Sequence, residues 1–93
     1  MTRLRILVSG RVQGVWYRRS AQVKAKALGI TGWAHNLIGG QVEMVCEGEE
    51  KNIKEFLVWA KKGPFFARVK HTEAIEEPHV GEFTSFEVRE FGF

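Results

Sequence analysis

Residues Gly10 to Arg18 combine two glycines, four positions apart, with cationic side chains. Glycine tolerates positive φ, so the loop between Gly10 and Gly14 can turn its backbone N–H groups inward, beside the positive end of the helix that follows. Arg18 falls in the first turn of that helix, where its guanidinium can donate two parallel hydrogen bonds to the same anion. The segment therefore predicts a phosphate site. For the glycine pair alone, a plain turn flanked by solvated arginines is the better interpretation, because short glycine patterns occur by chance.

A second polar residue, Asn36, shares its strand phase with Gly32 and Ala34. Small residues at alternating positions let a helix approach closely, so the Asn36 amide is expected beside the first helix. An asparagine near an arginine-held phosphate can position a water molecule. An asparagine that starts the turn toward Gly39 is the alternative, and the spacing leaves both open. His35 is expected on the opposite face of the strand, as a surface histidine.

The elements that must position these residues are indicated by hydrophobic periodicity and by glycine and proline stop signals. The predicted elements are a strand around residues 4–8, a helix over 17–28, a hairpin of 30–37 and 41–48, a helix over about 49–62, and strands within 67–77 and 85–91. Each helix has a single apolar stripe to bury, so both are expected on one face of an antiparallel sheet. The order β-α-β-β-α-β with an additional C-terminal strand predicts an α+β fold, a ferredoxin-like α/β sandwich, as one domain over residues 1–93.

Charge and composition limit the classes of reaction and of ligand that the chain can support. The chain has 14 Lys and Arg against 11 acidic residues, all of them Glu, which favours anionic partners and argues against an aspartyl-phosphate intermediate or an Asp-held magnesium ion. The three histidines lack the spacing of zinc ligands, so neither a metal nor a cofactor is expected. The single Cys46 is interpreted as a small buried apolar residue. Apolar runs too short to span a membrane and an N-terminus without a cleavable apolar segment predict a cytoplasmic protein.

The stretches "GRVQGVWYR" and "GITGWAHN" together closely resemble the signature of the acylphosphatase family, and the resemblance continues through "GGQVEMVCEG" and "GPFFARV". It implies a small free-standing, metal-independent hydrolase of acyl phosphates. The family's anion-binding arginine would be Arg18 and its water-orienting asparagine Asn36. Its phosphate cradle would be the backbone N–H groups of Arg11, Val12, Gln13, Gly14 and Val15. Trp16, Lys70 and His71 depart from common family residues and bear on substrate preference.

An arginine and an asparagine supply neither a general acid nor a general base near neutral pH. The substrate must therefore be reactive already, and an acyl phosphate is, because its leaving carboxylate departs without being protonated. Inorganic phosphate is expected as product and competitive inhibitor, and the protein is expected to be a monomer without nucleic-acid or membrane partners.

Two alternatives were weighed against this interpretation. A ferredoxin-like RNA-binding module would suit the basic charge, but the strand "VEMVC" lacks the aromatic residues on which bases stack. The other is the acylphosphatase-like domain at the front of larger carbamoyl-transfer maturation proteins. The lack of zinc-finger cysteines and of a further domain favours the free-standing enzyme.

Overall fold

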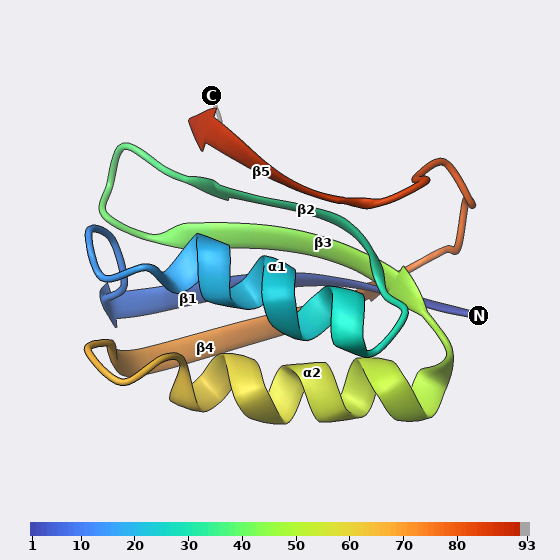
Figure 1. Cartoon of the computed structure of the whole chain (residues 1–93), viewed down its shortest axis with the longest axis horizontal. Helices are drawn as coiled ribbons and strands as arrows, with labels where there is room; N and C mark the ends of the chain where they lie inside the picture. Colours follow the sequence, from blue (N-terminus) through green and yellow to red (C-terminus); the bar gives the residue numbers. More distant parts are fainter. Residues whose placement is uncertain (92–93) are drawn as a thin grey trace.

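The computed structural model describes residues 1–91 and contains two helices and five strands (Figure 1). In chain order they are β1 (Thr2–Arg11), α1 (Tyr17–Ala27), β2 (Thr31–Asn36), β3 (Val42–Gly48), α2 (Glu50–Lys62), β4 (Arg68–Glu77) and β5 (Phe86–Phe91). The predicted element order and the ferredoxin-like α+β fold are confirmed. The helix bounds agree with the sequence prediction to within a residue.

The five strands form one sheet in the order β4-β1-β3-β2-β5. The first four pair antiparallel, as expected, but β5 runs parallel to β2. The expectation of an antiparallel sheet was therefore wrong for this last strand, and the sheet is mixed. The physical reason is that the connection after β4 carries the chain across to the far edge, where β5 starts at the same end as β2 (Figure 1).

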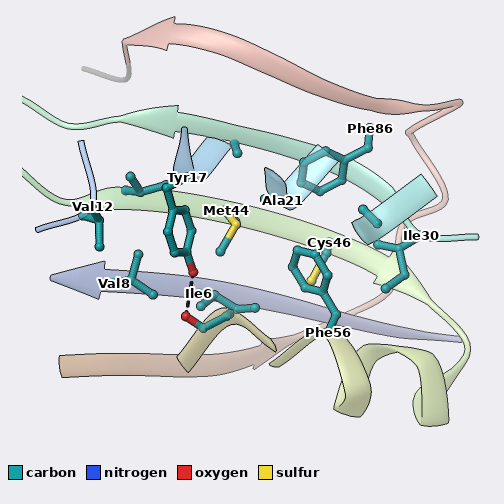
Figure 2. Packing of buried hydrophobic residues seen from close by; sticks show 14 of the residues in the cluster. Ile6, Val8, Val12, Tyr17, Ala21, Ile30, Met44, Cys46, Phe56 and Phe86 are labelled. Atoms are coloured by element: carbon teal, nitrogen blue, oxygen red, sulfur yellow. Dashed lines mark hydrogen bonds between the residues drawn. The ribbon is translucent and has the colours of Figure 1, made fainter. Parts of the chain in front are cut away.

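Both helices cover the same face of the sheet and enclose the hydrophobic core with it (Figures 1 and 2). Phe56 of α2 packs against Phe86 of β5, with their ring centroids 6.0 Å apart. The buried Tyr17 hydroxyl donates a hydrogen bond of 2.7 Å to the carbonyl of Ala60, which ties the start of α1 to α2. Cys46 is fully buried in this core, and its burial raises the pKa of the thiol to about 12.

The two helices begin differently. Glu50 lies in the first turn of α2 and Lys61 and Lys62 in its last, so these charges complement the helix dipole. The N-cap of α1 is Trp16, whose backbone is left-handed at φ 66°. Within the described chain, no side chain caps α1 and its first turn has no acidic residue. The positive end of α1 is thus left uncompensated by the protein.

The other face of the sheet is covered by ion pairs. Glu77 accepts hydrogen bonds from Arg5 (2.9 Å) and Arg3 (3.0 Å), and these hold the pKa of its carboxyl below the usual value. His35 lies on this face, as predicted, but it is only 8% exposed. Its ring lies 4.2 Å from that of Trp33, and its Nε2 is 2.7 Å from a carboxylate oxygen of Glu43. The expectation of a surface histidine was therefore wrong, because Trp33 of the same strand and Glu43 of β3 lie against the ring.

Candidate active site

A cavity of about 440 Å³ lies where the β1–α1 loop and α1 meet β2 and β5. It brings together Gly14, Arg18 and Asn36, which the sequence analysis had singled out in separate segments. The lining residues are Val12, Gly14, Trp16, Tyr17, Arg18, Arg19, Gln22, Asn36 and Val88. Of the residues expected to cradle phosphate, Val12 and Gly14 line the cavity, whereas Arg11, Gln13 and Val15 are not among its lining residues.

The β1–α1 loop is held in place by buried valine side chains and by hydrogen bonds to a neighbouring turn. Val12 and Val15 are buried at 1% and 5% exposure and anchor the loop in the core. Gln13 lies between these two residues in sequence, and its Nε2 donates hydrogen bonds to the carbonyls of Leu37 (2.7 Å) and Gln41 (2.9 Å). The loop is therefore tied to the β2–β3 turn, which lies at the same end of the sheet (Figure 1).

The backbone N–H groups of this loop are not used in regular backbone hydrogen bonding. Those of residues 12–15 donate to no backbone carbonyl within residues 1–91. Gly14 takes φ 73°, and open space surrounds the position that a Cβ would occupy there. Glycine is thus required at this position for its backbone conformation, not for lack of room. The loop then leads directly into the uncapped N-terminus of α1, which is a favourable environment for an anion.

Arg18 is held by the C-terminal strand. Its Nη1 donates hydrogen bonds to the carbonyls of Arg89 and Glu90, the second at 3.2 Å. The register between β2 and β5 shifts at this point: His35 pairs with Arg89 and Asn36 with Phe91, so Glu90 is an extra residue. Bulges of this kind interrupt the regular hydrogen bonding of a strand and are frequent beside active sites. The irregularity in β5 therefore orients the guanidinium.

Asn36 lies at the end of β2, on the face of the sheet that the helices cover. Asn36 is 9% exposed as a whole, and its Oδ1 is buried without a hydrogen-bond donor among residues 1–91. A buried amide oxygen without a partner costs free energy, about 1–3 kcal/mol in typical cases, so it indicates a ligand or water that completes the bond. Of the two interpretations left open by the sequence, a residue facing the cavity fits this geometry.

Five lining residues were not among the expected site residues: Trp16, Tyr17, Arg19, Gln22 and Val88. Trp16 was expected only to bear on substrate preference, and Arg19 follows Arg18 in sequence without a signal of its own beyond that proximity. Gln22 donates a hydrogen bond of 3.0 Å to the carbonyl of Phe86, which ties α1 to β5. Val88 reaches the cavity only because β5 lies next to β2, a neighbourhood that no local pattern in the sequence indicates.

Comparison with known proteins identifies the family. The profile of the family described as "Acylphosphatase" matches residues 4–88. The chain belongs to the acylphosphatase family. It is 50% identical over 88 residues to an acylphosphatase of Methylococcus capsulatus, with 95% of this chain and 96% of that protein covered. The crystal structure of the acylphosphatase from Bacillus subtilis superposes with a TM-score of 0.92 at 32% identity, covering 96% and 99% of the two chains. For the acylphosphatase from Coxiella burnetii the TM-score is 0.89 at 40% identity, covering 95% of this chain and 92% of that one.

An acylphosphatase hydrolyses the carboxyl–phosphate bond of acyl phosphates, and this chain is such an enzyme with a small-molecule acyl phosphate as substrate. The RNA-binding alternative is not favoured. On the open face of the central strand β3, Glu43, Val45 and Glu47 stand where a base-stacking surface would need aromatic rings. Within the described part of the acylphosphatase, no cluster of three or more potential metal ligands is present, and no helix is long and apolar enough to cross a membrane.

Proposed function

We propose that the cavity binds the phosphoryl group of the substrate and that two side chains divide the work of hydrolysis. The backbone N–H groups of Arg11 to Val15 and the Arg18 guanidinium bind the phosphoryl oxygens. Asn36 orients the attacking water through Oδ1. The uncapped start of α1 adds a favourable field for the charge that the phosphoryl group carries.

These residues suit a reaction whose leaving group needs no help. The leaving carboxylate is stable without a proton, so no general acid is required, and phosphoryl transfer depends mainly on positioning and on stabilising charge. The water attacks phosphorus, the bond from phosphorus to the carboxyl oxygen breaks, and the bonding electrons leave with the carboxylate. The proton of the water passes to an oxygen of the phosphate itself, because neither Arg18 nor Asn36 can accept it.

The observation that carries the assignment is the unpartnered Oδ1 of Asn36 in the same cavity as Arg18. Oδ1 is closed to solvent in this structure, so a rotation of the amide must precede its acceptance of a hydrogen bond from water, and this bond leaves an oxygen lone pair of the water free to attack. Arg18 is unsuited to this task, since a guanidinium has donors only.

Hydrolysis in ¹⁸O-labelled water tests the direction of attack. Attack at phosphorus places the label in inorganic phosphate and none in the carboxylate; label in the carboxylate would show attack at the carbonyl carbon and contradict the proposal.

Removal of the guanidinium in Arg18→Ala should lower kcat/KM by about 10²-fold or more, because a charge-stabilising donor is lost in the transition state. Arg68→Ala is the matched control, since Arg68 is exposed and lies outside the cavity lining.

Four finer properties belong to the same proposal. Inorganic phosphate inhibits competitively, because it fits the phosphoryl site, and this is checked by initial-rate kinetics.

No metal takes part, so activity should survive dialysis against EDTA; loss of activity restored by magnesium or zinc would contradict this. The enzyme is a monomer, to be tested by sedimentation equilibrium. It acts in the cytoplasm, and cell fractionation tests this location.

A further inference from the structure

We infer that Trp16 is a specificity-determining residue that contacts the acyl group, so that this enzyme prefers acyl phosphates with an apolar, planar acyl group. The inference rests on the proposed function, because it places the phosphoryl group against the loop, Arg18 and Asn36. It assigns the remaining part of the cavity to the remaining part of the substrate.

The first observation is the backbone of Trp16. At φ 66° it is the one non-glycine residue within residues 1–91 with a positive φ. The left-handed conformation is unfavourable for a bulky side chain, and glycine or asparagine normally occupies it. Strain of this kind persists where a functional requirement or surrounding contacts maintain it. Protein contacts do not account for it here, because the Trp16 side chain is packed against little of the protein, with 73% of the residue exposed.

The second observation is where the exposed indole lies. Trp16 lines the cavity that contains Arg18 and Asn36. The other apolar lining residues differ in accessibility: Val12 and Tyr17 are 1% exposed and belong to the core, whereas Val88 is 39% exposed. An acyl group in the cavity therefore has two apolar side chains to contact, Trp16 and Val88.

The geometry of the displacement indicates which of these two side chains the acyl group contacts. In-line displacement puts the attacking water and the leaving carboxylate on opposite sides of phosphorus. Val88 pairs with Ala34, two residues before Asn36 on the neighbouring strand, so it belongs to the side from which the water attacks. Trp16 comes from the loop at the start of α1, whereas Asn36 and Val88 both come from the sheet. The leaving acyl group is thus directed toward the indole, whose flat apolar surface suits an aromatic ring.

The test compares benzoyl phosphate with acetyl phosphate. The two substrates share the phosphoryl group and have leaving carboxylates of similar basicity, so the difference between them reports contacts of the acyl group. The wild type should have the higher kcat/KM for benzoyl phosphate. In Trp16→Gly, which fits the left-handed backbone, kcat/KM for benzoyl phosphate should fall roughly tenfold, the size expected for loss of one aromatic contact with its buried area. The value for acetyl phosphate should change less than about twofold, since uniform phosphoryl binding is kept.

Three further variants make the result decisive. Trp16→Phe should restore most of the preference, and Phe66→Ala should leave it unchanged, because Phe66 is an exposed aromatic residue outside the cavity lining. Loss of preference in Val88→Ala but not in Trp16→Gly would overturn the inference, as would an equal fall for both substrates in Trp16→Gly, which indicates a disturbed phosphate loop. Failure of the wild type to hydrolyse either substrate would contradict the proposed function instead, so the two failures are distinguishable.

Discussion

Asn36 has an amide oxygen for which no described residue supplies a donor, and this single atom distinguishes its proposed role from that of Arg18. A group that holds only the water contributes to the transition state and little to substrate binding. Asn36→Ala should therefore lower kcat by about 10²-fold or more with KM nearly unchanged, as in the loss of a contact made in the transition state. Steady-state kinetics measures both parameters.

Asn52→Ala provides the control for this substitution, because Asn52 lies in α2 and outside the cavity lining. A raised KM with an unchanged kcat in Asn36→Ala would assign the amide to the phosphoryl group and contradict its role on the water.

At the scale of single elements, the start of α1 combines poor local stability with a position beside the cavity. Trp16→Gly removes the cost of a left-handed backbone and loses few contacts, so unfolding should require about 0.5–1 kcal/mol more free energy, after the higher entropy of unfolded glycine is deducted. Urea denaturation measures the change. Lys26→Gly, inside the same helix, should instead destabilise by roughly 0.5–1 kcal/mol. A destabilised Trp16→Gly would mean that the indole stabilises the fold.

The helices and the β1–α1 loop were predictable because their signals are local. Gly10 and Gly14 act on the loop that contains them. The charges of Glu50, Lys61 and Lys62 act on the helix turn in which each lies. The family signature likewise indicates Arg18 and Asn36; both line one cavity, and their roles stay a prediction. Sequence reasoning failed where the cause is a neighbour distant in sequence. The parallel pairing of β5, its bulge at Glu90 and the burial of His35 depend on which strands meet and in which register, and no local periodicity encodes that.

At the scale of the whole molecule, the ion pairs of the open face make stability dependent on pH. Hydrogen bonds from Arg5 and Arg3 hold the pKa of Glu77 below its unfolded value of 4.5. A carboxyl group whose pKa is lower in the folded state stabilises the fold fully at pH values above its unfolded-state pKa. This contribution is lost as the pH falls below about 4.5 toward the folded-state pKa. Glu77→Gln should cost about 1 kcal/mol at pH 7, the sum of two partly exposed pairs, and should flatten the acid limb of the stability curve.

Urea unfolding at a series of pH values measures this dependence. Glu87→Gln is the control, because Glu87 is exposed and its contact with Arg89 is longer, at 3.5 Å. An acid limb equally steep in Glu77→Gln and the wild type would mean that other carboxyl groups dominate acid unfolding.

Phosphate binding should also stabilise the whole fold. A ligand that binds only the native state adds RT ln(1 + [L]/Kd), so phosphate at about 100 times its Kd should add roughly 2.7 kcal/mol and raise Tm by several degrees. Arg18→Ala should lose most of this shift and Asn36→Ala should keep it, because only the first removes a contact to the anion. Thermal scans with sodium chloride at matched ionic strength correct for screening; equal shifts in wild type and Arg18→Ala would place the anion elsewhere.

Arg18 is attached to the bulged edge strand, and if it binds the phosphoryl group as proposed, we expect activity to depend on local opening of that strand. Among residues 1–91, β5 pairs only with β2, and Arg18 hydrogen-bonds to two of its carbonyls. Edge segments open at lower free energy than the core of a domain, so β5 amides should exchange with deuterium faster than those of the central strand β3. Phe86 at the start of β5 is buried in the core, so fraying limited to the end of the strand around Arg89 and Glu90 would release the guanidinium while the core stays folded. Heat should therefore reduce activity at temperatures where the native core is still intact, and the strand at the margin of the sheet sets the working range of the enzyme.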